Sequence, residues 1–379
     1  MKKIYLIGKI IGSYRSQNII SILIKNNYSV FFDLGSNYLD GMKRNNIWNK
    51  ILIKIMKILD KILEFPRKLL MLVVSDVVIL LAMNNMKKWE LNLAKFLKKK
   101  IITDYYISFY DTEVLDRKNV GLKSSKAQKI LESDRRIVDK ANEVIFLNKV
   151  EAERYLKLID RDLKDVNYRI IPLCIDKKDE VKMPFFNKKN DFITICWWGT
   201  YIPLHGLEKI IDAMEILKKE DIKFKLFLFG NNEREGEKYQ KIVKELMLEK
   251  NITIINDYTF SNGKLTKFLV DNCDLVLGNF GDSEKSKTVL VNKIIDGIAM
   301  KAPVLNGESS APDEFFDYSN DIWKAKNNPQ NIAKKIKEIY LTDKKEVLRR
   351  VENSYKIYKK NFSEEAFEDK ILSIIEEVR

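Results

Sequence analysis

Val-Leu-Gly-Asn-Phe-Gly-Asp-Ser-Glu-Lys-Ser-Lys-Thr-Val-Leu-Val-Asn-Lys-Ile-Ile-Asp-Gly-Ile-Ala-Met-Lys-Ala-Pro-Val-Leu-Asn, residues 276–306, runs from an apolar strand through a polar loop into a helix that starts near Val291, and then into a strand at Pro303. Helix N-termini attract anions through their unpaired N–H groups. Further donors and charges lie beside this one: Ser286, Lys287, Thr288, Asn292 and Lys293. Asp296, near the first turn, suits a neutral polyol. The stretch predicts a site for a ligand that joins an anion to a polyol, as a nucleotide sugar does.

The length and composition favour two globular domains. At 379 residues the chain is long for one core, and its 45% hydrophobic and 32% charged content is not that of a disordered protein. The three cysteines, Cys174, Cys196 and Cys273, have neither metal-site nor disulfide-framework spacing. The single histidine, His205, excludes a multi-histidine metal site.

The same features predict a cytoplasmic protein. The N-terminal apolar run is too short for a signal peptide and reads as a buried strand, and the run 69–83 is too short to span a bilayer. The net charge of +14 indicates an acidic partner, such as a phosphorylated substrate, anionic lipid or nucleic acid. A lysine-rich bias of an AT-rich genome explains the charge equally well.

Strand and helix signals alternate twice along the chain, and this alternation predicts parallel sheets with crossover helices. The first half has expected strands at 3–7, 29–34, 72–81, 100–104 and 143–147. A hinge is expected at 169–175, and the pattern restarts with strands at 192–198, 224–229, 252–255 and 275–278. We therefore expect an α/β protein with two Rossmann-like, doubly wound domains that face each other across a cleft, at 1–172 and 173–354, followed by closing helices at 355–379.

Several short motifs resemble the family-4 GT-B glycosyltransferases. The segment Trp198–Glu208 is similar to the opening of their C-terminal domain, and Asp296–Val304 to the end of their acidic motif. Leu228-Phe229-Gly230 and Asp271–Leu277 are similar to the strands between. Weaker similarity continues through the first half, around Asp104, Ser108, Asp111 and Asp134. The resemblance implies a retaining glycosyltransferase that uses a nucleoside diphosphate sugar without a metal or other cofactor.

The resemblance also implies residue roles in the second domain. Lys287 and Lys293 would bind the diphosphate, and Asp296 would bind the ribose. Asn292 and Ser286 would add supporting hydrogen bonds. Gly199 and Gly230 would allow close backbone approach. Four positions depart from the family pattern. Thr200 and His205 replace an Arg and a Lys that hold the diphosphate, and Thr288 and Asp296 replace the first and second Glu of the acidic motif. His205 still suits a phosphate or hydroxyl contact, or is a plain surface residue.

The first domain is expected to bind the acceptor. Past the end of a central strand, Asp111 and then Asp104 are the candidate catalytic carboxylates for an acceptor hydroxyl, with helix capping or turn formation as the alternative. The turn after the first strand contains Gly12, Ser13 and Arg15, which would reach the acceptor or the diphosphate. That turn is not the dinucleotide-binding GxGxxG, and a simple helix cap explains it equally well.

Residues 43–68 combine lysines and arginines with apolar residues at helical spacing, and Trp48 lies near one end. A basic amphipathic helix of this kind suits an anionic membrane surface, here the inner face of the plasma membrane. A helix packed on its own sheet with solvated lysines gives the same pattern. Insertions in this region of the fold often shape the acceptor site, which favours a glycan or lipid-linked acceptor.

Two other functions fit parts of the sequence. The departures at Thr200, His205 and Thr288 fit a catalytically silent GT-B subunit that scaffolds a partner transferase. The positive charge fits a nucleic-acid binder, but the lysines are spread along the chain and no recognition module is present. We therefore expect no nucleic-acid partner.

Overall fold

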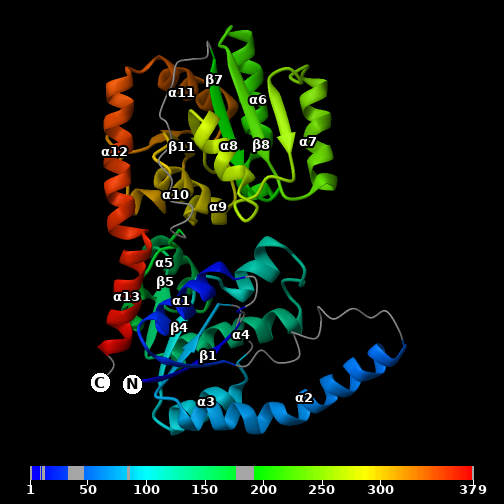
Figure 1. The fold of residues 1–379 in the computed structure, drawn as a ribbon, viewed down its shortest axis with the longest axis vertical. Coiled ribbons are helices and arrows are strands. Elements are labelled where there is room, and N and C mark those ends of the chain that lie inside the picture. Colours follow the sequence, from blue (N-terminus) through cyan, green and yellow to red (C-terminus); the bar gives the residue numbers. More distant parts are fainter. Residues whose placement is uncertain are drawn as a thin grey trace. The chain divides into compact units, whose positions relative to one another are not determined.

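The computed structural model describes residues 2–8, 10, 13–32, 47–82, 86–175 and 192–377. The chain divides into two compact units, each with one six-stranded sheet (Figure 1). Unit 1 comprises residues 1–147, 152–171 and 368–379, and unit 2 comprises residues 148–151 and 172–367.

Unit 1 is a doubly wound parallel sheet in the order β2-β1-β3-β4-β5-β6. Its strands are β1 (Lys3–Ile7), β2 (Ser29–Phe32), β3 (Val77–Leu80), β4 (Lys100–Asp104), β5 (Glu143–Phe146) and β6 (Tyr168–Ile170). Its helices include α1 (Tyr14–Lys25), α2 (Ile47–Val74), α3 (Lys88–Phe96), a π-helix (Asp111–Asp116), α4 (Ser125–Lys140), α5 (Lys149–Leu158) and a 3-10 turn (Leu163–Asp165). The last helix, α13 (Glu364–Glu376), enters unit 1 at Glu368, which accepts hydrogen bonds from Lys25 and Asn26.

Unit 2 repeats the architecture with the order β12-β11-β10-β7-β8-β9, also all parallel. Its strands are β7 (Ile193–Trp198), β8 (Phe224–Phe229), β9 (Ile252–Ile255), β10 (Leu275–Leu277), β11 (Val304–Gly307) and β12 (Trp323–Ala325). Its helices are α6 (Leu207–Lys219), α7 (Glu233–Glu245), α8 (Lys264–Asn272), α9 (Glu284–Thr288), α10 (Asn292–Ala299), α11 (Pro329–Leu341) and α12 (Lys344–Asn361), with 3-10 turns at Pro203–His205 and Pro312–Glu314.

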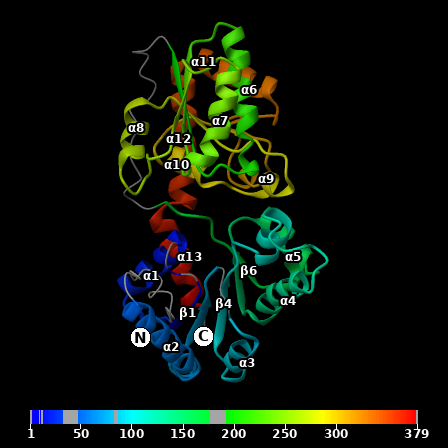
Figure 2. The same cartoon turned by 90° about the vertical axis from the view of Figure 1, so that its right-hand side faces the viewer.

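Side chains of β7 alternate between two cores because successive strand residues point to opposite faces of the sheet. Ile195 and Trp197 pack with α6, α7 and α11, whereas Cys196 and Trp198 pack with α8, α10 and α12. The two groups of helices therefore cover opposite faces of the sheet (Figure 2). Both faces are apolar, as expected for a parallel sheet buried on both sides.

Most expected elements of the sequence are found, and the α/β fold class with two doubly wound domains is confirmed. One boundary was wrong: residues 72–74, expected in a strand, end α2, which continues through Pro66 and stops before Ser75. The expected hinge at 169–175 begins inside β6. The loop before α10 contains the short helix α9, which Ser283 caps by accepting a hydrogen bond from Ser286 N–H.

Candidate functional site

The strand order of unit 2 places its candidate site. β7 and β10 are neighbours, but the chain leaves β7 toward β8 and β9 and returns from β10 toward β11 and β12. In open α/β sheets ligands bind at such a switch point, beyond the carboxyl ends of the strands. Gly199 follows β7 and Gly278 follows β10, so the loops that begin at these glycines border the site.

Two charged or polar side chains from separate parts of the chain meet here. Nζ of Lys293, in the first turn of α10, lies 3.0 Å from Nδ1 of His205, in the 3-10 turn after β7. Both residues are buried, with 3% and 7% of their surfaces exposed. When Lys293 is protonated its ammonium only donates, so Nδ1 accepts and the ring proton is on Nε2. In that state the pair is a buried cation held by a neutral imidazole.

Burial lowers the pKa of both groups, which favours their neutral forms. Burial, together with the nearby Lys293 charge, lowers the pKa of His205 to about 2, so this imidazole stays neutral at physiological pH. Burial also holds the pKa of Lys293 well below its usual value, and the negative charge of Asp296 opposes this effect in part. A buried cation without a full countercharge favours an anionic ligand, which would supply that charge.

Two tryptophans at the end of β7 hold this cluster. The Lys293 ammonium lies 4.7 Å from the ring centroid of Trp197, a cation–π contact. On the other face of the sheet, Trp198 Nε1 donates to Asp296 Oδ2 over 3.1 Å. A carboxylate has about four acceptor positions, so Asp296 can also accept ribose hydroxyls. The tryptophans fix the two ends of the α10 first turn against the strand.

Gly199 opens the space in front of this cluster. Its φ of +148° lies in a region that favours glycine, and an added Cβ would stand 3.4 Å from Lys293 Nζ and 3.6 Å from His205 Nε2. A side chain here would fill the approach to both nitrogens. Residues of α10 add backbone donors, since its N-cap Val291 makes no side-chain capping bond and no acid lies in its first turn.

The loops after β7 and β10 are locked together. Gly206 has a φ of +60°, and a Cβ on it would lie 2.5 Å from the carbonyl oxygen of Phe280. The Phe280 N–H also donates to the His205 carbonyl over 3.2 Å. Asn279, which is buried, donates to the Ser286 carbonyl and accepts from Gly281 N–H. The position of His205 is therefore set by packing between the two loops.

Other residues predicted for the donor site have local roles. Ser286 Oγ donates to the Ser283 carbonyl, and Thr288 Oγ1 donates to the Glu284 carbonyl. Lys287 is exposed and forms a 2.9 Å ion pair with Glu284. Thr200 and Asn292 are exposed, and each is a sequence neighbour of a cluster residue. Gly230 packs against Tyr201, whose ring would overlap a Cβ at that position. The structure thus brings together Gly199, His205, Lys293 and Asp296 from the predicted set.

In unit 1 the two candidate carboxylates are buried and paired. Asp104, at the end of β4, receives hydrogen bonds from Arg15 Nε and Nη2 over 2.8–3.0 Å. Asp111, at the start of the π-helix, receives bonds from both terminal nitrogens of Arg154. Both oxygens of each carboxylate accept hydrogen bonds from a guanidinium, so this geometry suits a positioning role.

The turn after β1 partly matches its expected roles. Ser13 caps α1 by accepting from Ser16 N–H, which is the capping role considered from the sequence. Arg15 reaches Asp104 and lies 5.4 Å from the ring centroid of Tyr106. Gly12 lies outside the described residues.

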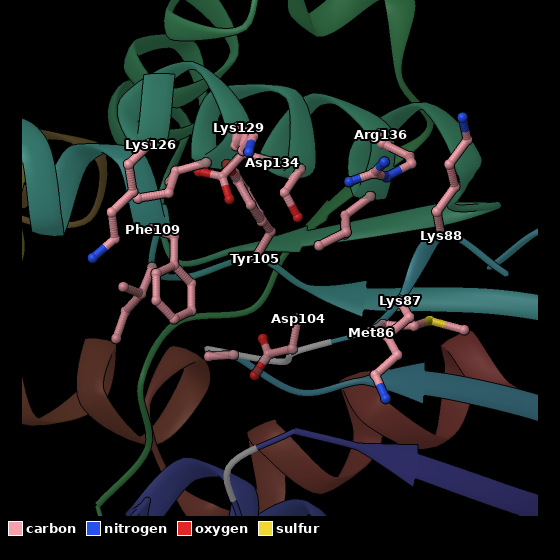
Figure 3. A pocket seen from close by; sticks show the side chains of 15 residues that line it. Met86, Lys87, Lys88, Asp104, Tyr105, Phe109, Lys126, Lys129, Asp134 and Arg136 are labelled. Carbon is pink, nitrogen blue, oxygen red and sulfur yellow. The ribbon is translucent and has the colours of Figure 1, made fainter. Parts of the chain in front are cut away.

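Unit 1 also contains a cavity of about 460 Å³ beneath α4 (Figure 3). The carboxyl ends of β3 and β4 and the start of α3 form its other walls. Asp104 lies at its floor, and lysines from α3 and α4 surround it. Its volume is that of a typical small-molecule site.

The described parts of the chain contain neither a metal-binding group of side chains nor a membrane-spanning helix. No three His, Cys, Asp or Glu side chains there are grouped so that they could hold a metal ion. None of the described helices has the length and apolarity needed to cross a bilayer.

Comparison with solved structures identifies the fold. HepE from Anabaena, solved with UDP, superposes with a TM-score of 0.69 at 13% identity over 100% of both chains. Sucrose-phosphate synthase from Thermosynechococcus elongatus gives 0.67 at 12% identity, over 100% of this chain and 99% of that one. A glycosyltransferase from Rickettsia africae ESF-5 superposes with a TM-score of 0.66 at 14% identity, over 100% of this chain and 98% of that one.

Sequence comparison found no relative: no known family matches the chain, and no curated protein does. At this level of identity the structural similarity establishes the architecture alone. The chain has the GT-B fold.

Sequence reasoning missed several residues of the cluster. Trp197 and Trp198 read as ordinary strand residues, and nothing in the sequence joins His205 to Lys293 across 88 positions. Their common location at the β7–β10 switch point was the available signal. Arg154, which pairs with Asp111, lies in a helix with many charges and had no distinguishing pattern.

Proposed function

We propose that the chain is a glycosyltransferase that uses a nucleoside diphosphate sugar, with UDP as the nucleotide, and transfers its sugar with retention to a glycan or lipid-linked acceptor. The observation that carries the proposal is the buried Lys293 ammonium, which faces Gly199 at the switch point of unit 2. HepE, which shares the fold, was solved with UDP and with UDP-glucose. Unit 2 would therefore hold the donor and unit 1 the acceptor.

The cluster has the chemistry that departure of a nucleoside diphosphate needs. Negative charge grows on the diphosphate as the glycosidic bond breaks, and preorganised donors stabilise that charge most in a site without water. Lys293 and the α10 N-terminus would supply the cation and the N–H groups in place of a metal. The diphosphate would raise the pKa of Lys293 again, because a nearby anion favours the charged form.

The neutral His205 would orient both the lysine and the ligand. Its Nδ1 accepts from Lys293, and its Nε2–H is directed to the space in front of Gly199. A donor at Nε2 suits a phosphate oxygen or a sugar hydroxyl. Asp296, held by Trp198, would accept the ribose hydroxyls.

Contact with an anionic membrane at α2 forms part of this proposal. Ten apolar side chains of α2 are 45–64% exposed, and they follow one stripe: Ile51, Leu52, Ile55, Ile58, Leu59, Ile62, Leu63, Phe65, Leu70 and Val73. Beside the stripe runs a row of lysines, Lys50, Lys54, Lys57 and Lys61. The N-terminal half of α2 extends beyond the other helices of unit 1 (Figure 1).

The acids of α2 form ion pairs with cations outside that row. Asp60 pairs with Arg67, and Glu64 pairs with Lys68 and Lys87. An exposed apolar stripe next to a cationic row is the pattern of a helix that lies in a membrane interface. This placement favours a lipid-linked acceptor, presented at the surface to which unit 1 would bind.

The function is tested by incubating the protein with UDP-glucose, UDP-galactose and the two UDP-N-acetylhexosamines, in the presence of lipid extract, and measuring UDP release. Release with one donor, and its loss in Lys293→Met, supports the proposal. The absence of UDP release and of UDP binding would refute it.

A silent subunit is the second candidate. It is favoured by the pairing of Asp104 and Asp111 with arginines, which occupies the carboxylate oxygens that an acceptor hydroxyl would need. It predicts UDP binding without turnover by the isolated chain, and turnover when a partner transferase is added. Comparing binding with turnover in the same preparation separates the two functions.

A further inference from the structure

The cavity beneath α4 in unit 1 has a lining that the donor site does not explain. Its polar and charged lining comes from β4, from α4 and from the start of α3: Lys87, Lys88, Asp104, Lys126, Lys129, Ser133, Asp134 and Arg136. Lys126 lies at one end and Lys88 at the other, with Lys129 between them along α4 (Figure 3). These lysines are exposed, so the cations line the rim of the cavity along its length.

Most of these cations have no countercharge among the described residues. Lys88, Lys126, Lys129 and Arg136 form no ion pair with any of the residues that the structure describes. Nε of Arg136 is also buried without a hydrogen-bond acceptor in that part of the chain. Lys87 differs, because it pairs with Glu64 over 2.8 Å. A buried guanidinium nitrogen without an acceptor is costly unless a ligand provides one.

The acids of the cavity are already satisfied. Asp104 accepts three hydrogen bonds from Arg15, which neutralises its charge. Asp134 accepts from Ser108 Oγ and from Tyr110 N–H, and burial raises the pKa of its carboxyl. Arg15 offsets the charge of Asp104, so the lysines and Arg136 outnumber the remaining carboxyl of Asp134, and the cavity attracts anions.

The remaining lining is apolar. Ala82, Met86, Phe109, Ile130 and Ile137 contribute hydrocarbon surface between the charged groups. A free inorganic ion would leave this surface exposed to water, whereas a ligand with an apolar part would cover it. Several converging cations that include an arginine favour a phosphate over a carboxylate, because a phosphate has more charge and more acceptor oxygens.

We propose that this cavity binds the phosphate group of a phosphate ester whose apolar part packs on Met86, Phe109 and Ile130, and that this ester is the acceptor. The second half rests on the proposed glycosyl transfer, whereas binding of the ester does not. Lys126, Lys129 and Arg136 hold the phosphate, and the apolar side chains select an ester over the free ion.

Calorimetric titration of the full chain tests the proposal with three probes: decyl phosphate below its micelle concentration, decyl glucoside and inorganic phosphate. Decyl phosphate is expected to bind, and the variant Lys126→Gln/Lys129→Gln/Arg136→Gln to bind it about 30-fold more weakly or worse. The exposed single change Lys129→Glu is expected to act in the same direction, and it serves if the triple variant does not fold.

The matched control removes three exposed lysines of the same unit outside the cavity, in Lys123→Gln/Lys157→Gln/Lys164→Gln. It is expected to keep wild-type affinity for decyl phosphate, and equal losses in both triple variants would overturn the site in favour of unspecific attraction. Equal binding of decyl glucoside would overturn the phosphate contact. Equal binding of inorganic phosphate would overturn the ester and leave free phosphate as the ligand.

Titration of UDP into the same variants separates this proposal from the donor site. The cavity variants are expected to bind UDP as the wild type does. Absence of UDP binding with intact binding of decyl phosphate would refute the proposed function and leave the cavity assignment standing. Intact UDP binding without binding of decyl phosphate would overturn the cavity assignment and leave the donor site standing.

Discussion

Replacing Lys293 by methionine separates what this residue does for the fold from what it does for a ligand. Methionine has nearly the same length and volume, so no cavity is expected. The change removes a buried ammonium, and replacing buried ion pairs by apolar groups is often neutral or stabilising by about 1–4 kcal/mol. It also leaves Nδ1 of His205 without its donor, which costs about 1–3 kcal/mol. Loss of the cation–π contact with Trp197 costs about 1 kcal/mol more.

These opposing contributions predict that the free energy of unfolding changes by less than about 2 kcal/mol. Affinity for UDP should change far more, because a phosphate would lose its buried cation. Loss of one partner from such a charge pair costs about 2–5 kcal/mol, which is about 30-fold or more in Kd. Urea unfolding and calorimetric titration of UDP give the two quantities.

Lys287→Met is the matched control, because the sequence nominates both lysines for the diphosphate. Lys287 is exposed and pairs with the neighbouring Glu284, so neither stability nor UDP affinity should change by more than about 1 kcal/mol. Wild-type UDP affinity in Lys293→Met would refute the reasoning, as would an equal loss in Lys287→Met.

The pH dependence of stability and the surface of α2 give further predictions. The folded pKa of His205 is about 2 and the unfolded value is near 6.5, so the unfolded chain takes up the proton as pH falls below 6.5. Relative to His205→Gln, the wild type should therefore lose about 2 kcal/mol of unfolding free energy between pH 7.5 and pH 5. Urea unfolding measures this loss, and an equal loss in the wild type and the variant would contradict a buried neutral ring. Leu59→Gln/Ile62→Gln should weaken cosedimentation with phosphatidylglycerol vesicles about tenfold, since each loses an exposed side chain from the interface. The control Phe96→Gln/Met247→Gln changes exposed apolar positions outside α2 and should not weaken cosedimentation. The same weakening in both double variants would argue against a membrane contact of α2.

The fold was predictable because its strands are continuous apolar runs between turn signals. The expected bounds of β1, β4 and β8 agree with the structure for this reason. The α2–β3 boundary failed because residues 69–80 are apolar almost throughout, and periodicity alone does not separate a buried helix end from a strand. Pro66 also sits inside α2, where a proline usually ends a helix.

The site was predictable in composition but not in geometry. Residue types pointed equally to Lys287 and Lys293, and only the tertiary structure shows that one is exposed and the other buried beside His205. The departure at His205 counted against the family pattern in the sequence. In the structure it forms part of the cluster, because the loops after β7 and β10 bring it to α10.

The most direct test of the account is a thermal-shift measurement of the full chain with UDP, GDP, ADP and CMP. At about one hundred times its Kd, UDP should add about 2.7 kcal/mol, which corresponds to about 5–10 °C for a unit of this size. A nucleotide site at Lys293 predicts this shift for UDP in the wild type and its loss in Lys293→Met. A flat response to every nucleotide, or an unchanged UDP shift in the variant, would contradict a nucleotide site at Lys293.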